Sequence, residues 1–426
     1  MGIELGLTRI TNLLAKLGNP HLTSNFIHVA GTNGKGSVCA YLSSILVQGT
    51  PFKIGRFTSP HLIYRHDSVT LNNKPVGRDL FTSVEGEIKK INETFKIGAT
   101  EFEILTAIAF KIFNLEKVDI AVMEVGLGGI EDSTNVITPA IVKNNQILEK
   151  GVLVTGITKI GMDHENILGS TLKEIASQKA GIIKNDVPNV VDGSNEHQVL
   201  QLIRDVSEKH HSENYEVNPT SNKIHTSFGV INKETSPLKG DYQLQNLSIA
   251  LKIIDILSPI FLQTYHIKLT KEHIQEGVLK TSWPGRLQSY TYVTSTGVNK
   301  SLLLDGAHNG SASRALKKYI DETYNGEPIT FIIAVTKGKD LNPLLSQLIK
   351  ETDQIIVTSF GKVDGMPWIK ANEIEDLKKE SLKYTKNVKG NPNVIDILEN
   401  LEDDRNIIVC GSLYLVGELL RLQEDV

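Results

Sequence analysis

Two patterns of apolar and polar residues alternate along this chain. Continuous apolar runs at 26–30 and 119–125 are typical of strands buried inside a parallel sheet. Apolar residues recur at helical spacing in 5–17, 100–115 and 240–257. Such an alternation of strands and helices predicts an α/β fold with a doubly wound sheet.

The same alternation returns in the last third of the chain, with strand-like runs at 302–304, 331–335, 355–358 and 407–410 and helix-like segments at 312–324 and 341–350. The segment 283–299 between the two regions is turn-rich, as domain boundaries often are. A length of 426 residues also fits two domains. We therefore expect a P-loop, doubly wound N-terminal domain over 1–290 and a smaller Rossmann-like α/β domain over 291–426.

Two polar segments interrupt the first predicted domain. Residues 143–150 separate two apolar stretches and predict a hairpin-like insertion. Residues 210–226 are polar and turn-rich, and we expect them to form a surface connection.

Composition narrows the class of partner. The net charge is −4, and the basic residues are scattered, so the sequence shows no electrostatic footprint for nucleic acid or an anionic membrane. The two cysteines, Cys39 and Cys410, lie far apart among apolar or small residues and predict reduced core thiols. No stretch approaches the roughly 20 apolar residues of a membrane span, and the N-terminus lacks a basic, apolar leader pattern. We expect a cytoplasmic protein that binds small molecules, with a mitochondrial copy left open.

The segment Gly31 to Ser37 reads GTNGKGS and joins the first apolar run to a helical segment. Its glycines let the backbone turn tightly and bring N–H groups against a polyphosphate. Lys35 supplies a positive charge for the β and γ phosphates, and Ser37 supplies a hydroxyl for Mg²⁺. The spacing departs from the strict phosphate-loop pattern because Gly36 separates Lys35 from Ser37. We interpret it as a variant nucleotide-binding loop rather than a glycine turn without a ligand.

Polar residues follow two further apolar runs. Glu124 stands at the end of the run 119–125, where a carboxylate beside a phosphate loop can hold Mg²⁺ or can cap the following loop. Asp163 and His164 follow a run that ends at Ile160 and are candidate metal ligands, with a satisfied turn as the alternative.

Other polar positions carry weaker signals. Lys179 lies near the end of a predicted helix, and from its pattern alone we expect a solvated side chain. Gln243 and Asn246 stand three apart at the start of a helix, a spacing that suits capping or contact with a nucleobase. Phe102 fits a core position. In the second predicted domain, DGAHN at 305–309 and GSLY at 411–414 follow strands, and we expect both loops to face the ligand of the first domain.

The motifs taken together resemble one family. In order along the chain they are GTNGKGS, TSPHL, EVGLGG…DSTN, DH, KAGI, WPGR, DGAHN and CGSLY. This series is similar to the folylpolyglutamate synthase and dihydrofolate synthase family of the Mur-ligase type. TEFE, GMPW and VCGSLYLVGELL are most like the fungal dihydrofolate synthases. The match covers nearly the whole chain.

The resemblance implies roles for individual residues. Catalytic roles fall on Lys35, His164 and Lys179. ATP contacts fall on Gly31, Thr32, Asn33, Gly34, Lys35, Gly36, Ser37, Asn246, Arg286, Asp305 and His308. Metal ligands fall on Ser37, Ser59, Glu124, His164 and Lys179, the last of these as a carbamate. Substrate contacts fall on Phe102, Ser59, His61, His308 and Ser412.

The resemblance also implies an activity: ATP-dependent ligation of L-glutamate to dihydropteroate through an acyl phosphate. The implied cofactors are two Mg²⁺ ions and a monovalent cation, and we expect a monomer. Glutamate addition to tetrahydrofolate is the nearest alternative, and a P-loop regulator without ligase activity is an alternative of another class. One departure stands out, because Ile130 occupies the position where the family usually has Arg. The segment 141–156 is also longer than the family pattern predicts.

Overall fold

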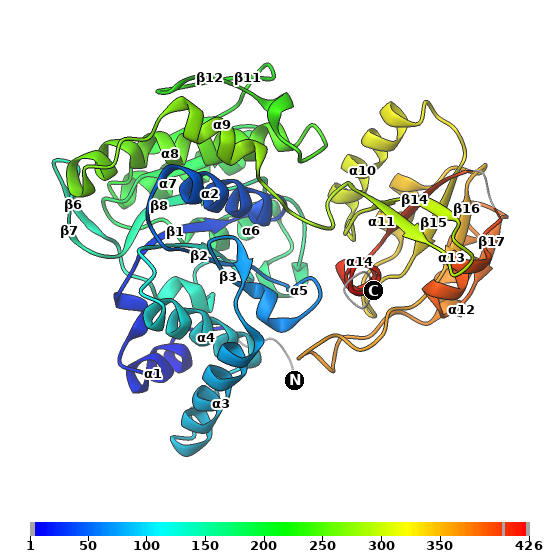
Figure 1. The fold of residues 1–426 in the computed structure, drawn as a ribbon, viewed down its shortest axis with the longest axis horizontal. Coiled ribbons are helices and arrows are strands. Elements are labelled where there is room, and N and C mark those ends of the chain that lie inside the picture. Colours follow the sequence, from blue (N-terminus) through cyan, green and yellow to red (C-terminus); the bar gives the residue numbers. More distant parts are fainter. Residues whose placement is uncertain (1–4, 403–404, 423–426) are drawn as a thin grey trace. The chain divides into compact units, whose positions relative to one another are not determined.

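The computed structural model describes residues 5–402 and 405–422, and these form two compact units (Figure 1). The first unit contains the chain up to residue 61 together with 66–237 and 242–282. The second contains 62–65, 238–241 and the chain from 283 onward. The main division thus falls at 283, compared with 291 in the sequence-based expectation. No sequence pattern indicated that 62–65 and 238–241 group with the second unit.

The first unit is built on an eight-stranded sheet with the order β10-β9-β8-β1-β5-β2-β3-β4. Its strands are β1 (Asn25–Ala30), β2 (Ile54–Phe57), β3 (Val69–Leu71), β4 (Lys74–Pro75), β5 (Ile120–Glu124), β8 (Val152–Ile157), β9 (Asn189–Asp192) and β10 (Asn214–Val217). Pairing is parallel from β10 to β2 and antiparallel at β3 and β4. β1, β5 and β8 are buried throughout, as their continuous apolar runs predict.

Helices cover both faces of this sheet, as Figure 1 shows. On one face lie α2 (Lys35–Gly49), α8 (Gln243–Tyr265) and α9 (Lys271–Leu279), with α2 in contact with both of the others. On the other lie α1 (Thr8–Lys16), α3 (Arg78–Thr94) and α4 (Glu101–Leu115). The remaining helices of this unit are α5 (Glu165–Leu168), α6 (Leu172–Ala180) and α7 (His197–Lys209). They share an apolar cluster with residues of β8 and β9. Short 3₁₀ turns occur at Pro20–Leu22, Arg65–Ser68, Ser133–Val136 and Lys233–Thr235.

Capping residues in the sequence fix where two of these helices begin. Thr100 caps α4, and Glu103 reaches back to the Thr100 backbone N–H. Thr171 and Glu174 form the same reciprocal arrangement at α6. Both pairs follow the Thr-x-x-Glu pattern of a capping box.

Helix α8 corrects one sequence-based expectation. It is long and apolar enough to cross a membrane, with a mean hydropathy of 1.5 over its most apolar window. About half of that window, 56%, is buried, and the helix packs on α2, β8 and β9. Its apolar character is therefore accounted for by its place in the core of the first unit.

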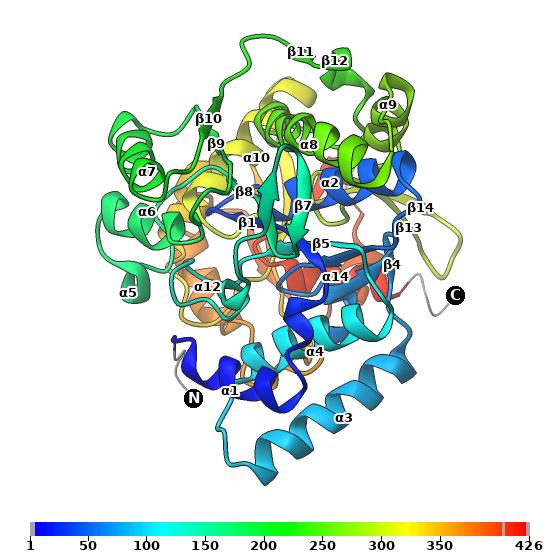
Figure 2. The ribbon, with the colours of Figure 1, turned by 90° about the vertical axis from the view of Figure 1, so that its left-hand side faces the viewer.

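Two antiparallel hairpins lie outside the main sheet. β6 (Ile141–Lys143) and β7 (Gln146–Glu149) form the hairpin predicted at 143–150 and lie against α8 (Figure 2). Asn144 and Asn145 make its turn with φ of 51° and 61°, values that Asn tolerates in tight hairpins. β11 (Lys223–Thr226) and β12 (Gly229–Asn232) form the second. The segment 210–226, expected to be a surface connection, is mostly exposed or half-buried, but it also contains β10 and β11, which were not predicted. Both strands are short and partly exposed, so no apolar run marks them.

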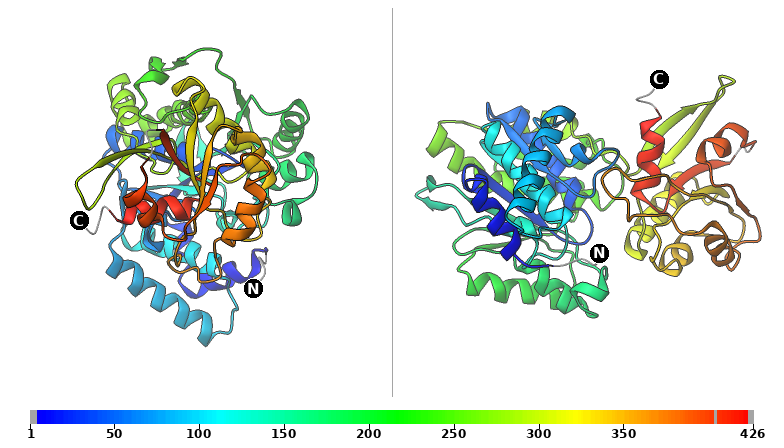
Figure 3. Two further views of the ribbon diagram at one scale, coloured as in Figure 1. Left: turned by 90° about the vertical axis from the view of Figure 1, so that its right-hand side faces the viewer. Right: turned by 90° about the horizontal axis from the view of Figure 1, so that it is seen from below.

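The second unit is a smaller α/β domain with a six-stranded sheet in the order β13-β14-β18-β15-β16-β17 (Figure 3). Its strands are β13 (Gln288–Val293), β14 (Asn299–Leu304), β15 (Ile329–Ile333), β16 (Gln354–Val357), β17 (Val388–Gly390) and β18 (Asn406–Cys410). Its helices are α10 (Gly310–Thr323), α11 (Asn342–Leu348), α12 (Ile374–Ser381), α13 (Val394–Asn400) and α14 (Leu413–Arg421). The segment 283–299, expected to be turns, contains β13. This edge strand buries only alternate residues and is the antiparallel partner of β14.

Candidate active site

Four loops of the first unit leave the same edge of its sheet. β8, β1, β5 and β2 are neighbours and run parallel, so their carboxyl ends meet there. The loops that follow them begin at residues 158, 31, 125 and 58. The sheet order therefore gathers the phosphate-loop candidate, Glu124, the Asp163–His164 pair and Ser59 at one edge.

The loop after β1 forms a tight glycine cradle. Gly31 has φ of 145°, and a Cβ added there would lie 1.9 Å from the Thr158 hydroxyl. Gly34 has φ of 98°, and a Cβ there would lie 2.2 Å from Oδ1 of Asn246. Gly34 is also the N-cap of α2 and has no side chain to accept hydrogen bonds from the first turn. A helix N-terminus capped by glycine suits a phosphate, because the ligand can take the place of a capping side chain.

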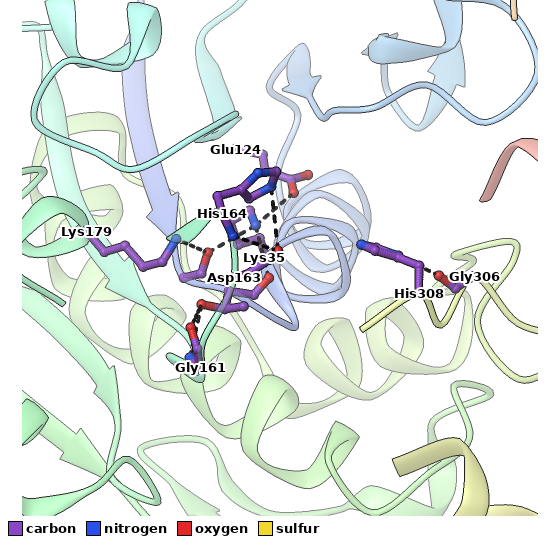
Figure 4. A network of polar contacts seen from close by, with 10 residues as sticks. Lys35, Glu124, Gly161, Asp163, His164, Lys179, Gly306 and His308 are labelled. Carbon is purple, nitrogen blue, oxygen red and sulfur yellow. Dashed lines mark hydrogen bonds and ion pairs between the residues drawn. The ribbon is translucent and has the colours of Figure 1, made fainter. Parts of the chain in front are cut away.

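Lys35 and Ser37 lie in the first turn of α2. The Lys35 ammonium donates to the carbonyls of Gly31 at 3.1 Å and Thr32 at 3.2 Å. It also lies 4.0 Å from Oε1 of Glu124 (Figure 4). The Ser37 hydroxyl is buried and accepts a hydrogen bond from Nε2 of Gln243 at 3.2 Å. Lysine, serine and glutamate thus surround the cradle in the arrangement that a nucleotide and its metal require.

The two amides at the start of α8 hold the phosphate loop. Besides the Gln243 bond to Ser37, Nδ2 of Asn246 donates to Oε1 of Gln243 at 3.0 Å. Neither amide caps α8, whose N-cap is Tyr242. Their i,i+3 spacing was the signal available in the sequence, but it did not indicate which loop they contact. The nucleobase contact of Asn246 stays a prediction.

Lys179 is buried, with 5% of its surface exposed, so the expectation of a solvated side chain was wrong. Its ammonium donates to the Gly31 carbonyl at 3.0 Å, the same oxygen that accepts from Lys35. Burial, followed by the nearby Lys35 charge, lowers the pKa of Lys179 to about 7. At neutral pH a large fraction of this amine is uncharged and nucleophilic, unlike a surface lysine.

The loop that carries Asp163 and His164 is fixed to the phosphate loop. Backbone N–H groups of Thr32 and Asn33 donate to the Lys159 carbonyl at 2.9 and 3.1 Å. The Thr32 hydroxyl accepts from the Gly161 N–H at 3.0 Å. His164 has φ of 52°, and its Nε2 lies 3.9 Å from Oδ1 of Asp163. Figure 4 shows these side chains grouped with Lys35 and Glu124. Lys159 and Gly161 were missed at the sequence level because their contacts are made by backbone atoms.

The site has the oxygen donors that Mg²⁺ prefers. Ser37 offers a hydroxyl and Glu124 a carboxylate. Among residues 5–402 and 405–422, no three His, Cys, Asp or Glu side chains are grouped as a ready-made metal site. Ser59 lies just after β2, and its role as a metal ligand stays a prediction.

Phe102 and His61 lie near the same edge. A Cβ on Gly126, two residues beyond Glu124, would come 2.1 Å from the Phe102 ring. The Phe102 ring also packs 6.1 Å from that of Phe57, so this residue borders the core as well as the loop after β5. His61 is buried, with 4% of its surface exposed. The predicted substrate contacts of Phe102 and His61 are compatible with these positions and stay predictions.

Asp132 anchors the loop after β5, although no role was predicted for it. Its carboxylate accepts from the Leu127 N–H at 2.8 Å and from the Thr134 hydroxyl at 2.5 Å. The Thr134 oxygen also accepts from Nε2 of His28, 2.8 Å away. Burial raises the pKa of the Asp132 carboxyl, and these hydrogen bonds oppose the rise. Its place in DSTN, directly after a glycine-rich loop, was the available signal.

In the second unit, four predicted site residues gather at the ends of β14 and β18, two neighbouring strands. Asp305 is buried and accepts from the N–H groups of Leu287 at 2.9 Å and Ala307 at 2.8 Å. Burial raises the pKa of Asp305, and the charge of Arg286 opposes this. A Cβ on Gly306 would lie 2.3 Å from the Arg286 guanidinium.

The other two residues of this group have partners within the same unit. Nδ1 of His308 hydrogen-bonds the Gly306 carbonyl at 2.8 Å. The Ser412 hydroxyl caps α14 by accepting from the Tyr414 N–H at 3.1 Å. Asp305 and Ser412 thus have clear structural roles, and ligand contacts of all four residues stay predictions.

A glycine cradle at a helix N-terminus, with a lysine, a serine and a strand-end glutamate around it, defines a nucleotide-dependent enzyme of two α/β domains. Comparison with known proteins narrows this class. The family model described as "Dihydrofolate synthetase, C-terminal domain" matches residues 288–422. A dihydrofolate synthetase of Saccharomyces cerevisiae is 43% identical, over 100% of this chain and 99% of its own length.

Two further relatives define the breadth of the family. A probable folylpolyglutamate synthase of S. cerevisiae is 31% identical, over 98% of this chain and 96% of its own length. Mycobacterium tuberculosis folylpolyglutamate synthase complexed with ADP has a similar structure, with a TM-score of 0.80 and 27% identity. That match covers 98% of this chain and 94% of the other. The chain belongs to the dihydrofolate synthetase and folylpolyglutamate synthase family, whose members are ATP-dependent ligases that form C–N bonds.

Proposed function

We propose that this protein is a dihydrofolate synthase, which joins L-glutamate to dihydropteroate and releases ADP and phosphate. The observation that carries the proposal is the 43% identity, over the full length, to a dihydrofolate synthetase. The folylpolyglutamate synthase of the same organism is only 31% identical over a similar length. The difference supports dihydropteroate over tetrahydrofolate as the acceptor.

The chemistry has two steps. The dihydropteroate carboxylate attacks the γ-phosphate of ATP, so an acyl phosphate forms and ADP leaves. The glutamate amine then attacks the acyl carbon, loses a proton and expels phosphate. The glycine cradle and the Lys35 ammonium would neutralise the negative charge that the phosphates carry in the first step. Arg286, Asp305, His308 and Ser412 remain candidates for nucleotide or amino-acid contacts.

Mg²⁺ would be held by Ser37 and Glu124, and when bound it would offset the negative charge of the phosphates. We also propose that Lys179 works as a carbamate. An uncharged, buried amine can add to CO₂, and the carbamate that forms is an anion with two oxygens. The amine loses a proton to solvent as the C–N bond forms. The carbamate would then pair with the neighbouring Lys35 ammonium and would supply a further oxygen ligand. A second Mg²⁺, a monovalent cation and a cytoplasmic, monomeric state stay predictions.

Release of ADP tests whether the protein is a ligase. Purified protein would be given ATP and Mg²⁺, then dihydropteroate and L-glutamate separately and together. We expect ADP at a substantial rate only when both are present, in a one-to-one ratio with dihydrofolate identified by mass. ADP release that neither compound changes would point instead to a P-loop ATPase or regulator without ligase activity.

A further inference from the structure

The loop after β5 is packed tightly against the C-terminal end of α6, the helix that carries Lys179. The Ile130 N–H donates to the Gln178 carbonyl at 3.0 Å. A Cβ on Gly129 would lie 2.4 Å from that same oxygen, and one on Gly181 would lie 2.1 Å from the Ile130 side chain. Two glycines therefore permit an approach that any larger residue would prevent. Ile130 fills this contact with its aliphatic side chain.

Asn135 joins these two segments through its side-chain amide. Its Nδ2 donates to the Ile130 carbonyl at 3.0 Å and to the Gly181 carbonyl at 3.1 Å. Its Oδ1 accepts from the Lys184 ammonium at 2.8 Å. The two carbonyls can only accept and the ammonium can only donate, so one orientation of the amide satisfies all three contacts. Asn135 is thus a cross-link between the loop after β5 and the end of α6.

We propose that Asn135 is a positioning residue for Lys179, acting by holding the end of α6 against the loop after β5. The inference rests on the proposed function, in which Lys179 acts beside the phosphates. Lys179 precedes Gly181 by two residues, and its ammonium reaches Gly31 of the phosphate loop. A shift of the helix end would therefore move this group relative to the phosphate loop. Displacements of about 1 Å can cost roughly a hundredfold in rate.

Two substitutions separate this role from a simple effect of charge. Asn135→Asp keeps the shape but sets a carboxylate against two carbonyl oxygens, while Asn135→Ala removes the cross-link without adding charge. We expect both to lower kcat by about 10–100-fold, the usual cost of losing a residue that orients a working group. The KM for ATP and the Kd for ADP with Mg²⁺ should stay within about twofold, because the phosphate cradle is intact. Asn400→Asp is the control. In the second unit, Nδ2 of Asn400 donates a single hydrogen bond to the Asp396 backbone carbonyl, at 2.9 Å.

Hydrogen exchange provides a readout that does not depend on the reaction. In both variants we expect faster exchange of the Ile130 and Ile182 amides, which donate to the last carbonyls of α6, and unchanged exchange in α2. Exchange and kcat like those of the native protein in Asn135→Ala, or a kcat loss confined to Asn135→Asp, would overturn the proposal. If one variant does not fold, the other decides. Native protein without ligase activity would refute the proposed function, and the exchange comparison would still decide whether Asn135 holds the helix end.

Discussion

The two units each contain a strand, a polar loop and a helix in the same order, yet the two helix N-termini differ. In the first unit, β1 leads through the glycine loop to α2, whose N-cap is Gly34. In the second, β14 leads through DGAHN to α10, whose N-cap Asn309 accepts from the Ala312 N–H at 2.8 Å. Asp305 also accepts hydrogen bonds from backbone N–H groups of its own unit.

The difference favours the junction of the first unit as the phosphate site that we propose. A capping side chain accepts a hydrogen bond from the first turn of its helix, so fewer backbone N–H groups remain to bind an anion. A glycine cap leaves these N–H groups available. The loop of the second unit instead presents side chains, such as His308. From the sequence, phosphate binding was assigned to the glycine-rich loop, and DGAHN was expected only to face the ligand of the first domain. The predictions below test this contrast, from the largest expected effect to the smallest.

Replacement of Lys35 by Ala should have the largest effect. Loss of this ammonium should lower kcat by about a thousandfold, because it removes a charge that stabilises the transferring phosphoryl group. Lys35 is the first residue of α2 and its ammonium contacts loop carbonyls rather than the apolar core, so the thermal unfolding midpoint should change little. Steady-state kinetics and calorimetry would check both points. A rate above about one tenth of the native value, a barrier change of less than roughly 1.4 kcal/mol, would contradict the role.

Lys179→Ala should lower activity by about a hundredfold if the buried lysine supplies an oxygen ligand as its carbamate. Added acetate or formate should then restore part of the rate by placing a carboxylate where the carbamate was. Lys173→Ala, which removes an exposed lysine from the same helix α6, is the control and should show neither the loss nor the rescue. Full activity of Lys179→Ala, or an unmodified lysine in a high-resolution structure of active enzyme, would count against the carbamate.

Gly34→Ala should weaken nucleotide binding through the shape of the cradle. The new Cβ would lie 2.2 Å from Oδ1 of Asn246, and φ of 98° disfavours any side chain. We expect the KM for ATP to rise about tenfold and stability to fall by about 1–2 kcal/mol. Gly98→Ala is the matched control, because Gly98 also has positive φ, at 72°, but open space around it. Equal effects of the two on KM would show that crowding at the cradle does not matter.

Asn309→Ala should have the smallest effect, and one confined to stability. Loss of this cap should cost about 1 kcal/mol, visible as a lower urea midpoint, while the KM for ATP stays within about twofold. Asn309→Ser keeps a capping oxygen and should restore most of the loss. A large rise in KM for ATP with unchanged stability would mean that the second junction also binds phosphate and that the contrast is wrong.

The sequence predicted the features that depend on local pattern. Buried strands such as β1 and β5, the phosphate loop and its helix, and the 143–150 hairpin follow from apolar runs, glycines and turn residues. β10 and β13 were missed, because edge strands bury only some of their residues. Lys179 was misjudged as solvated, since helical spacing does not reveal that a helix end is buried against a distant loop. Asn135 and Gln243 make contacts 46 and 206 residues away, which no local pattern encodes.

The choice of acceptor tests the central claim most directly. Protein, ATP, Mg²⁺ and labelled glutamate would be offered dihydropteroate or tetrahydrofolate, and kcat/KM would be measured for each. We predict rapid addition of a single glutamate to dihydropteroate and at least about a hundredfold lower kcat/KM with tetrahydrofolate. The reacting carboxylate of tetrahydrofolate lies on an added, flexible glutamate and would be out of line with the γ-phosphate. Comparable values for the two acceptors, or successive glutamates on tetrahydrofolate, would contradict the account and indicate a folylpolyglutamate or bifunctional synthase.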